Sequence, residues 1–157
     1  DKISINTSAV ENPEFITQAA KVFGRQCIIV SIDYKKNEKG ELEVYTHGGT
    51  KKTGLDPYEF ALKVSELGSG EILLTNIDRE GKREGYDVEM IAKVADAVSV
   101  PVIASGGAGS MEDLKYVIVQ GHASAVSLGS IFHFTDQNVI KARNYLHTHG
   151  VSVRIKA

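Results

Sequence analysis

The chain has 157 residues and a formal net charge of −2, which excludes the strongly basic surface needed to bind a nucleic-acid polymer or an anionic membrane. Its hydrophobic content of 42% and charged content of 24% are those of an ordinary globular protein, and no apolar run is long enough to span a membrane. The single cysteine, Cys27, excludes an internal disulfide. We therefore expect one domain over residues 1–157, in the cytoplasm and without a membrane partner.

Short apolar stretches alternate with longer amphipathic ones along the chain, which is the pattern of repeated strand–helix units. Polar residues interrupt this pattern once, as a hairpin with Gly40 near its turn. In chain order, the predicted elements are a strand at 2–6, a helix at 11–24, a strand at 27–33, the hairpin at 34–49, a helix at 55–68, a strand at 71–78, a helix at 87–98, a strand at 100–107, a helix at 110–121, a strand at 123–130 and a helix at 136–150.

Three of the helices carry clear start signals. Asn12 followed by Pro13 predicts the start of the first helix, because proline is favoured at the first helical position. Asp56 is expected to cap the second helix, and Ser110 the fourth, since their side chains accept hydrogen bonds from free backbone amides. These signals fix where each strand-to-helix connection ends.

The alternation predicts an α/β fold with a parallel sheet. The strands are continuous apolar runs, so both faces of the sheet are expected to be covered. Five strand–helix units fit either most of a (β/α)8 barrel or a complete flavodoxin-like sheet. Polar residues end all five strands, and this favours the barrel, because a doubly wound sheet uses mainly one crevice. These strand-end residues are Asn6, Thr7, Asp33, Thr75, Asp78, Ser105, Gly106, Gly107, Gly129 and Ser130.

The stretch "ASGGAGSMEDL" (104–114) combines consecutive glycines with the start of a helix. Backbone amides can approach an anion closely at such a place. Together with "LGS" (128–130), one unit later, it resembles the phosphate site that the last two loops of a barrel commonly form. Glycine-rich turns required by tight packing are the structural alternative.

Two aspartates end apolar strands. Asp33 is a candidate general acid or base, because its apolar surroundings could raise its pKa, although capping of the next turn is the simpler explanation. For Asp78 we expect an ion pair with Arg79 or Arg83. The histidines show no metal-ligand spacing and His147 and His149 are expected at the surface, so we predict neither a metal nor a cofactor.

The lysines around the hairpin have two possible interpretations. They occur at Lys35, Lys36, Lys39, Lys51 and Lys52. We expect them to be solvated surface charges, and a basic rim that attracts a phosphorylated substrate is the alternative.

Several longer stretches resemble one enzyme family nearly end to end. The chain is similar to the cyclase subunit of imidazole glycerol phosphate synthase, a lyase of histidine biosynthesis. The resemblance implies a (β/α)8 barrel whose mouth lies at the carboxyl ends of the strands. There, a phosphoribulosyl-formimino aminoimidazole carboxamide nucleotide reacts with ammonia, giving imidazole glycerol phosphate and an aminoimidazole carboxamide ribonucleotide. The stretches are "INTSAVENP" (5–13), "VSID" (30–33), "VYTHGGTKKTGLD" (44–56), "GEILLTNIDREGKREGYD" (70–87), "PVIASGGAG" (101–109) and "GSIFHF" (129–134).

The resemblance also implies roles for individual residues. Asp33 matches the catalytic aspartate of the fifth barrel strand, and Thr75 and Ser105 match residues that line the mouth. One substrate phosphate is expected at Gly106, Gly107, Gly129 and Ser130, and the other partly at Asn6 and Thr7. At the opposite end of the barrel, a glutaminase subunit that supplies ammonia is the implied partner, gated by Asp1, Lys2 and Glu71.

The chain departs from the family in one large respect. It begins on what corresponds to the fourth strand, so the first three units and a second catalytic aspartate are missing, and the chain alone is expected to be inactive. Two alternatives remain open. One is a homologous branch that amidates surface-polysaccharide sugars, and the other is an inert half-barrel that binds phosphate or assembles without catalysis.

Overall fold

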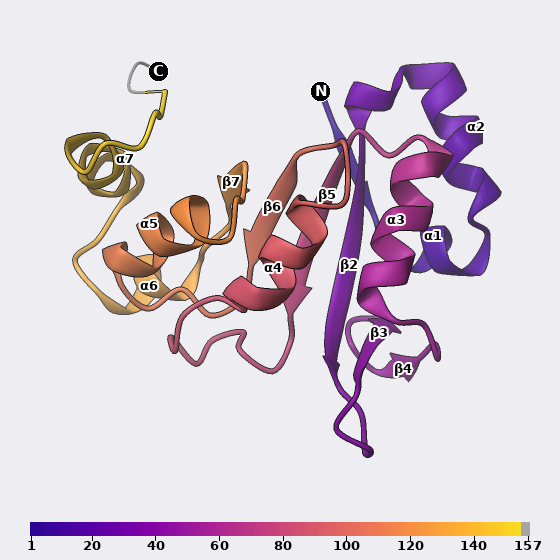
Figure 1. Cartoon of the computed structure of the whole chain (residues 1–157), viewed down its shortest axis with the longest axis horizontal. Coiled ribbons are helices and arrows are strands. Elements are labelled where there is room, and N and C mark those ends of the chain that lie inside the picture. The colour runs from indigo at the N-terminus through magenta and orange to yellow at the C-terminus, as the bar shows by residue number, and fades with distance from the viewer. Residues whose placement is uncertain (155–157) are drawn as a thin grey trace.

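A computed structural model describes residues 1–154, and these form an α/β fold with one mixed, mostly parallel sheet (Figure 1). The chain is a succession of strands connected by helices, with one antiparallel hairpin. Its strands are β1 (Ile3–Ile5), β2 (Ile28–Lys36), β3 (Leu42–Thr46), β4 (Lys51–Lys52), β5 (Glu71–Asn76), β6 (Val102–Ser105) and β7 (Ala125–Val126).

The helices follow the predicted alternation, with three short additions. Besides the five expected helices, α1 follows β1, the 3₁₀ turn η1 follows α2, and α6 follows β7. The helices are α1 (Thr7–Glu11), α2 (Glu14–Phe23), the 3₁₀ turn η1 (Arg25–Cys27), α3 (Pro57–Leu67), α4 (Val88–Ala95), α5 (Met111–Val119), α6 (Ser130–Phe134) and α7 (Val139–Thr148). None of the helices in residues 1–154 has the length and apolar character to cross a membrane.

The parallel strands lie in the order of the chain, β1-β2-β5-β6-β7, and the hairpin strands β3 and β4 extend from β2. A flavodoxin-like sheet instead reverses direction at a switch point, with its second strand outside the first. The flavodoxin-like alternative is therefore wrong for this chain. Parallel strands in sequential order are consistent with a (β/α)8 barrel, in which neighbouring strands also follow the order of the chain.

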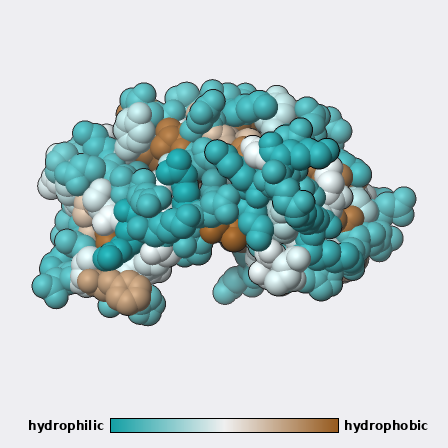
Figure 2. Space-filling model, turned by 90° about the horizontal axis from the view of Figure 1, so that it is seen from below, coloured by the Kyte–Doolittle hydropathy of each residue, from teal (hydrophilic) through white to brown (hydrophobic). Residues whose placement is uncertain are grey.

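The helices cover one face of the sheet, whereas the expectation of two covered faces is wrong. Along β2, buried side chains alternate with half-buried ones, and β5 repeats the alternation. The buried set, which includes Ile32 and Leu74, packs under helices such as α3 and α4. Seen from the carboxyl ends of the strands, the molecule is an arch with a hollow on one side (Figure 2). The apolar runs predicted burial correctly only for the helix-facing side.

A buried polar contact joins the ends of β2 and β5 to the start of α4. Tyr34 is fully buried, and its hydroxyl donates to Asp87 Oδ2 at 3.0 Å. Asn76 donates to the same oxygen at 2.8 Å, and Asp87 also caps α4 by accepting from the Met90 amide. Because all these groups are paired, the contact fixes both ends of the loop at 77–86 without leaving an unsatisfied buried group.

The helix caps confirm two predictions and correct one. Asp56 caps α3, and Ser110 forms a capping box with Asp113 at the start of α5. The predicted N-cap at Asn12 is wrong, because residues 7–11 form α1 and Asn12 ends that helix. Pro13 then occupies the N-cap position of α2.

Candidate functional site

Three predicted site residues lie side by side across neighbouring strands. Asp33 on β2 is paired in register with Thr75 on β5, and Thr75 is paired with Ser105 on β6. Residues in register on adjacent strands point to the same face of a sheet. All three are half-buried at the carboxyl ends of their strands, on the face that the helices leave open. We call Asp33, Thr75 and Ser105 the site row.

Asp33 is held by a neighbour on its own strand. Ser31 Oγ donates to Asp33 Oδ1 at 2.9 Å. Burial raises the pKa of the Asp33 carboxyl above its ordinary value, and the hydroxyls of Ser31 and Thr75 oppose that rise. A carboxyl whose pKa is shifted by burial, at the end of a strand, is a candidate for proton exchange with a substrate.

The raised pKa of Asp33 also has a consequence for stability. The folded protein holds this proton more tightly than the unfolded chain, so ionisation of Asp33 destabilises the fold as the pH rises from the unfolded pKa through the folded one. Asp33→Asn removes that cost. We expect its Tm advantage over wild type to grow between pH 4 and pH 7, reaching the order of 1 °C. Thermal unfolding at both pH values measures it, and a constant or negative difference would contradict the prediction.

Five of the predicted residues line a pocket of about 280 Å³ at the ends of β6 and β7. We call it the glycine pocket. It is lined by Ser105, Gly106, Gly107, Ala108, Ser127, Leu128, Gly129, Ser130, Glu80 and Gly81. Glu80 and Gly81, which were not among the predicted site residues, reach the pocket from the loop at 77–86. The charged, glycine-containing composition of that loop was the available signal.

Packing explains why two of these positions are glycine. Gly106 and Gly107 have φ angles of +88° and +111°, in the region that disfavours other residues. A Cβ on Gly107 would lie 2.2 Å from the Gly85 carbonyl oxygen. The structural explanation of "SGGAG" is therefore confirmed, and the phosphate role is a separate proposal.

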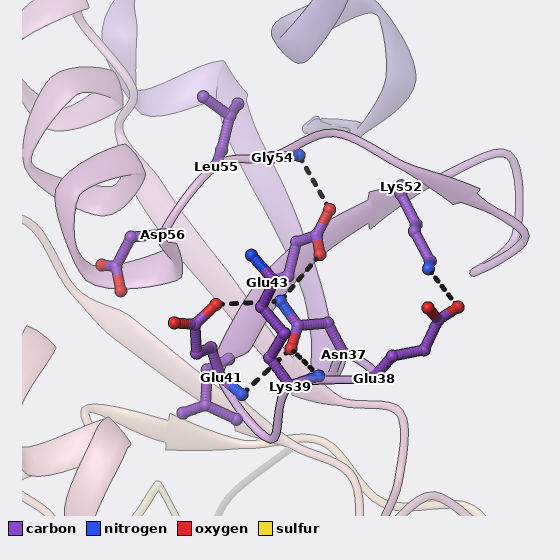
Figure 3. A pocket seen from close by; sticks show the side chains of 10 residues that line it. Asn37, Glu38, Lys39, Glu41, Glu43, Lys52, Gly54, Leu55 and Asp56 are labelled. Carbon is purple, nitrogen blue, oxygen red and sulfur yellow. Dashed lines mark hydrogen bonds and ion pairs between the residues drawn. The ribbon is translucent and has the colours of Figure 1, made fainter.

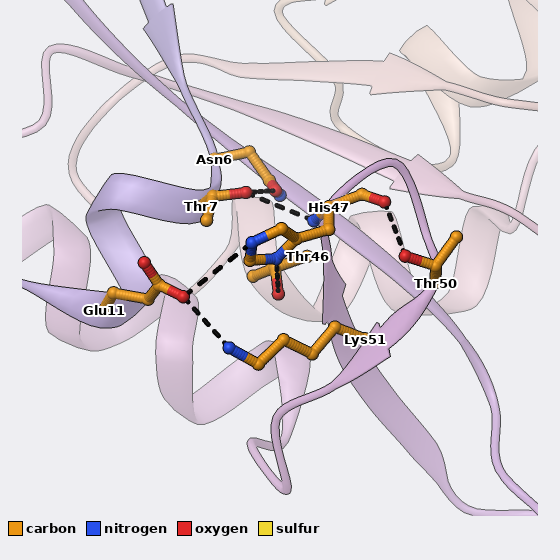
Figure 4. A network of polar contacts seen from close by, with 7 residues as sticks. All are labelled: Asn6, Thr7, Glu11, Thr46, His47, Thr50 and Lys51. Atoms are coloured by element: carbon orange, nitrogen blue, oxygen red, sulfur yellow. Dashed lines mark hydrogen bonds and ion pairs between the residues drawn. The ribbon is translucent and has the colours of Figure 1, made fainter.

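Asn6 and Thr7 lie away from the glycine pocket, on the other side of Asp33 in the strand order. Asn6 Nδ2 donates to the carbonyl oxygens of Ser31 at 3.1 Å and Tyr45 at 3.4 Å. The Thr7 hydroxyl accepts from the His47 amide at 3.2 Å (Figure 4). These contacts tie β1 and α1 to β2 and to the turn after β3.

The lysines near this turn are largely paired. Lys51 contacts Glu11 at 3.1 Å (Figure 4), and Lys52 contacts Glu38 at 2.6 Å (Figure 3). The Lys35 ammonium donates to the Gly49 carbonyl at 3.0 Å and lies over the Tyr45 ring. Three of the five lysines are thus engaged in local contacts, which favours surface charge over a basic rim for these three.

Asp78 does not form the predicted ion pair. Its Oδ2 accepts a hydrogen bond from the Lys36 amide at 2.9 Å, whereas Arg79 donates to the Gly85 carbonyl and Arg83 lies over the Phe134 ring. Asp78 lies close to both arginines in the sequence, which suggested an ion pair. The fold instead places the Lys36 amide, at the end of β2, within hydrogen-bond distance of the Asp78 carboxylate. Asp78 thus joins the ends of two strands, which is a structural role.

A larger pocket of about 610 Å³ lies beside the β2–β3 hairpin (Figure 3). Four carboxylates line it, from Glu38, Glu41, Glu43 and Asp56. Glu43 accepts from the Gly54 amide at 2.8 Å, which holds the pKa of its carboxyl below the ordinary value. Lys39 and Lys52 also line the pocket, and Lys52 is paired with Glu38, so the carboxylates still outnumber the lysines. A lining with this net negative charge disfavours a phosphate group, and we interpret the pocket as a structural feature of the hairpin.

The residues predicted at the opposite end of the barrel also come together. Lys2 before β1 and Glu71 at the start of β5 form an ion pair. Asp1 and Lys2 line a small pocket of about 240 Å³ with Ile3, Phe23 and Cys27. The structure thus places Asp1, Lys2 and Glu71 at the amino ends of the strands, away from the site row.

These features define a class: an α/β protein with sequentially ordered parallel strands and a carboxyl-containing site at their carboxyl ends. Comparison with known protein families makes the class more specific. Residues 1–138 match the family model described as histidine biosynthesis protein. The chain belongs to this family, which contains isomerases and cyclases of histidine biosynthesis.

Proposed function

We propose that this chain is part of the cyclase subunit of imidazole glycerol phosphate synthase, a lyase. The observation that carries the proposal is the site row, in which Asp33 is half-buried, has a raised pKa and lies two strands from the glycine pocket. The long sequence stretches that resemble the cyclase support this choice among the members of the family.

In the proposed reaction, Asp33 acts as a general acid and base. The substrate is the phosphoribulosyl-formimino aminoimidazole carboxamide nucleotide, and ammonia is the nitrogen donor. Proton transfer by one carboxyl group serves both bond cleavage and ring closure, because the group can give a proton in one step and take one in the other. Burial raises the pKa of the Asp33 carboxyl above its ordinary value, which favours this exchange. Thr75 and Ser105 line the path between the two substrate ends.

The substrate carries two phosphates, and the candidate anion-binding elements lie on opposite sides of Asp33. Gly106, Gly107, Gly129 and Ser130 bind one phosphate in the glycine pocket, where backbone amides and hydroxyls must outweigh the charge of Glu80. Asn6 and Thr7 form part of the site for the other phosphate, as the resemblance to the cyclase implies. Anchoring both ends holds the reacting centre at the carboxyl group, which lowers the entropic cost of reaction.

A glutaminase subunit is the proposed partner, at the amino ends of the strands. The Lys2–Glu71 ion pair and Asp1 gate the entry of ammonia there. The open face of the sheet, with the site row on it, forms part of the inner wall of the barrel. In this proposal the strands of the chain correspond to barrel strands four to eight, and a second catalytic aspartate lies on an earlier strand.

The test measures consumption of the phosphoribulosyl nucleotide by the complete enzyme, with an ammonium salt as nitrogen source. Formation of both products supports the proposal. A folded protein that binds the nucleotide but does not consume it contradicts the proposal and favours the branch that amidates polysaccharide sugars. No binding of the nucleotide favours an inert assembly module.

A further inference from the structure

Ser31 is a polar residue beside Asp33 to which the proposed reaction assigns no role. It lies two positions before Asp33 on β2, so both side chains point to the open face of the sheet. Its Oγ lies 2.9 Å from Asp33 Oδ1. This contact brings a hydroxyl donor to the carboxyl group of the site row.

The fold holds the backbone of Ser31 from both sides. On one side it is paired in register with Leu73 of β5. On the other, its carbonyl oxygen accepts from Asn6 Nδ2 at 3.1 Å. A donor fixed in this way loses little freedom when it forms its hydrogen bond, which makes the bond effective.

We propose that Ser31 is a positioning residue of the site, whose hydroxyl orients the Asp33 carboxylate and favours its ionised form. The inference rests on the proposed function for the role of Asp33, whereas the Ser31–Asp33 contact itself is independent of it. Hydrogen bonds to a charged acceptor are stronger than those between neutral groups, so the contact stabilises the carboxylate more than the carboxylic acid.

The other groups around Asp33 do not replace the hydrogen bond from Ser31. Thr75 faces it from β5, and Tyr45 is its partner in register on β3. Lys35 follows on the same strand, but its ammonium is directed to the Gly49 carbonyl. Of the groups that lower the pKa of Asp33, Ser31 contributes most and Thr75 follows.

The experiment compares Ser31→Ala with wild type in the complete enzyme. Carbon-13 NMR of the labelled Asp33 carboxyl, assigned with Asp33→Asn, gives its titration midpoint without any need for turnover. Loss of the donor is expected to raise the midpoint by about half to one pH unit. The acidic limb of the kcat–pH profile is expected to move upward by the same amount. Ser31→Thr keeps the hydroxyl and is expected to restore both midpoints.

An unchanged NMR midpoint in Ser31→Ala overturns the proposal. If Ser31→Ala does not fold, Ser31→Cys serves in its place, because a thiol is a weak donor of similar size; its midpoint is then expected to rise, and an unchanged value again overturns the proposal. Failure of the proposed function gives a different result: no variant turns over the nucleotide, yet the NMR midpoint still rises in Ser31→Ala.

Discussion

Asp33→Asn is expected to reduce turnover of the complete enzyme by about two to four orders of magnitude while leaving nucleotide binding in place. The amide has nearly the shape of the carboxylate and can still accept the hydrogen bond from Ser31, but it cannot exchange the proton. Consumption of the phosphoribulosyl nucleotide with ammonium salt measures turnover, and equilibrium titration of the nucleotide measures binding.

Asp78→Asn is the matched control for this experiment. Asp78 also follows an apolar strand, but its carboxylate accepts from the Lys36 amide, so we expect the variant to keep turnover within about threefold of wild type. Equal losses of turnover in Asp33→Asn and Asp78→Asn would show that both carboxylates affect turnover by stabilising the fold. Full turnover in Asp33→Asn would remove Asp33 from the mechanism.

Gly107→Ala is expected to destabilise the fold by about 2 to 5 kcal/mol, the largest effect on stability among our predictions. Its φ angle of +111° strains any residue with a Cβ, and that Cβ would lie 2.2 Å from the Gly85 carbonyl oxygen. Neither partner is a flexible side chain, so the backbone of one loop must move. Urea denaturation measures the loss.

Gly129→Ala is the control, because this glycine also lines the glycine pocket. Its φ angle is −131°, and an added Cβ meets no atom within 4 Å. We expect its free energy of unfolding to stay within about 0.5 kcal/mol of wild type. The prediction fails if Gly107→Ala unfolds at the same urea concentration as Gly129→Ala.

The elements were predictable from the sequence because the apolar runs are strong and their flanking signals are local. The runs placed β2, β5 and β6 within a few residues, and Asp56 and Ser110 marked two helix starts. Two features escaped this reasoning. The continuous apolar runs hid the difference between the two faces of the sheet, and the short helix α1 displaced the predicted cap at Asn12.

The site was predictable where it depends on strand ends alone. Parallel strands end at one edge, so Asp33, Thr75 and Ser105 were expected together, and the register confirms their alignment. Contacts between distant segments were not predictable. The pairing of Asp78 with the Lys36 amide depends on how far β2 extends beyond Asp33, which its charged final residues did not reveal.

The close packing of the two loops at the mouth limits how this protein can be re-engineered. Gly85 donates to the Gly107 carbonyl at 2.8 Å, and a Cβ on Gly109 would lie 2.1 Å from the Arg83 carbonyl oxygen. The backbone of the loop at 77–86 therefore packs directly against the backbone of residues 107–109, with no room for a Cβ at Gly107 or Gly109. A graft that imports the 106–110 segment from a related enzyme must therefore keep glycine at positions 107 and 109, because a Cβ at either would meet the backbone of the loop at 77–86.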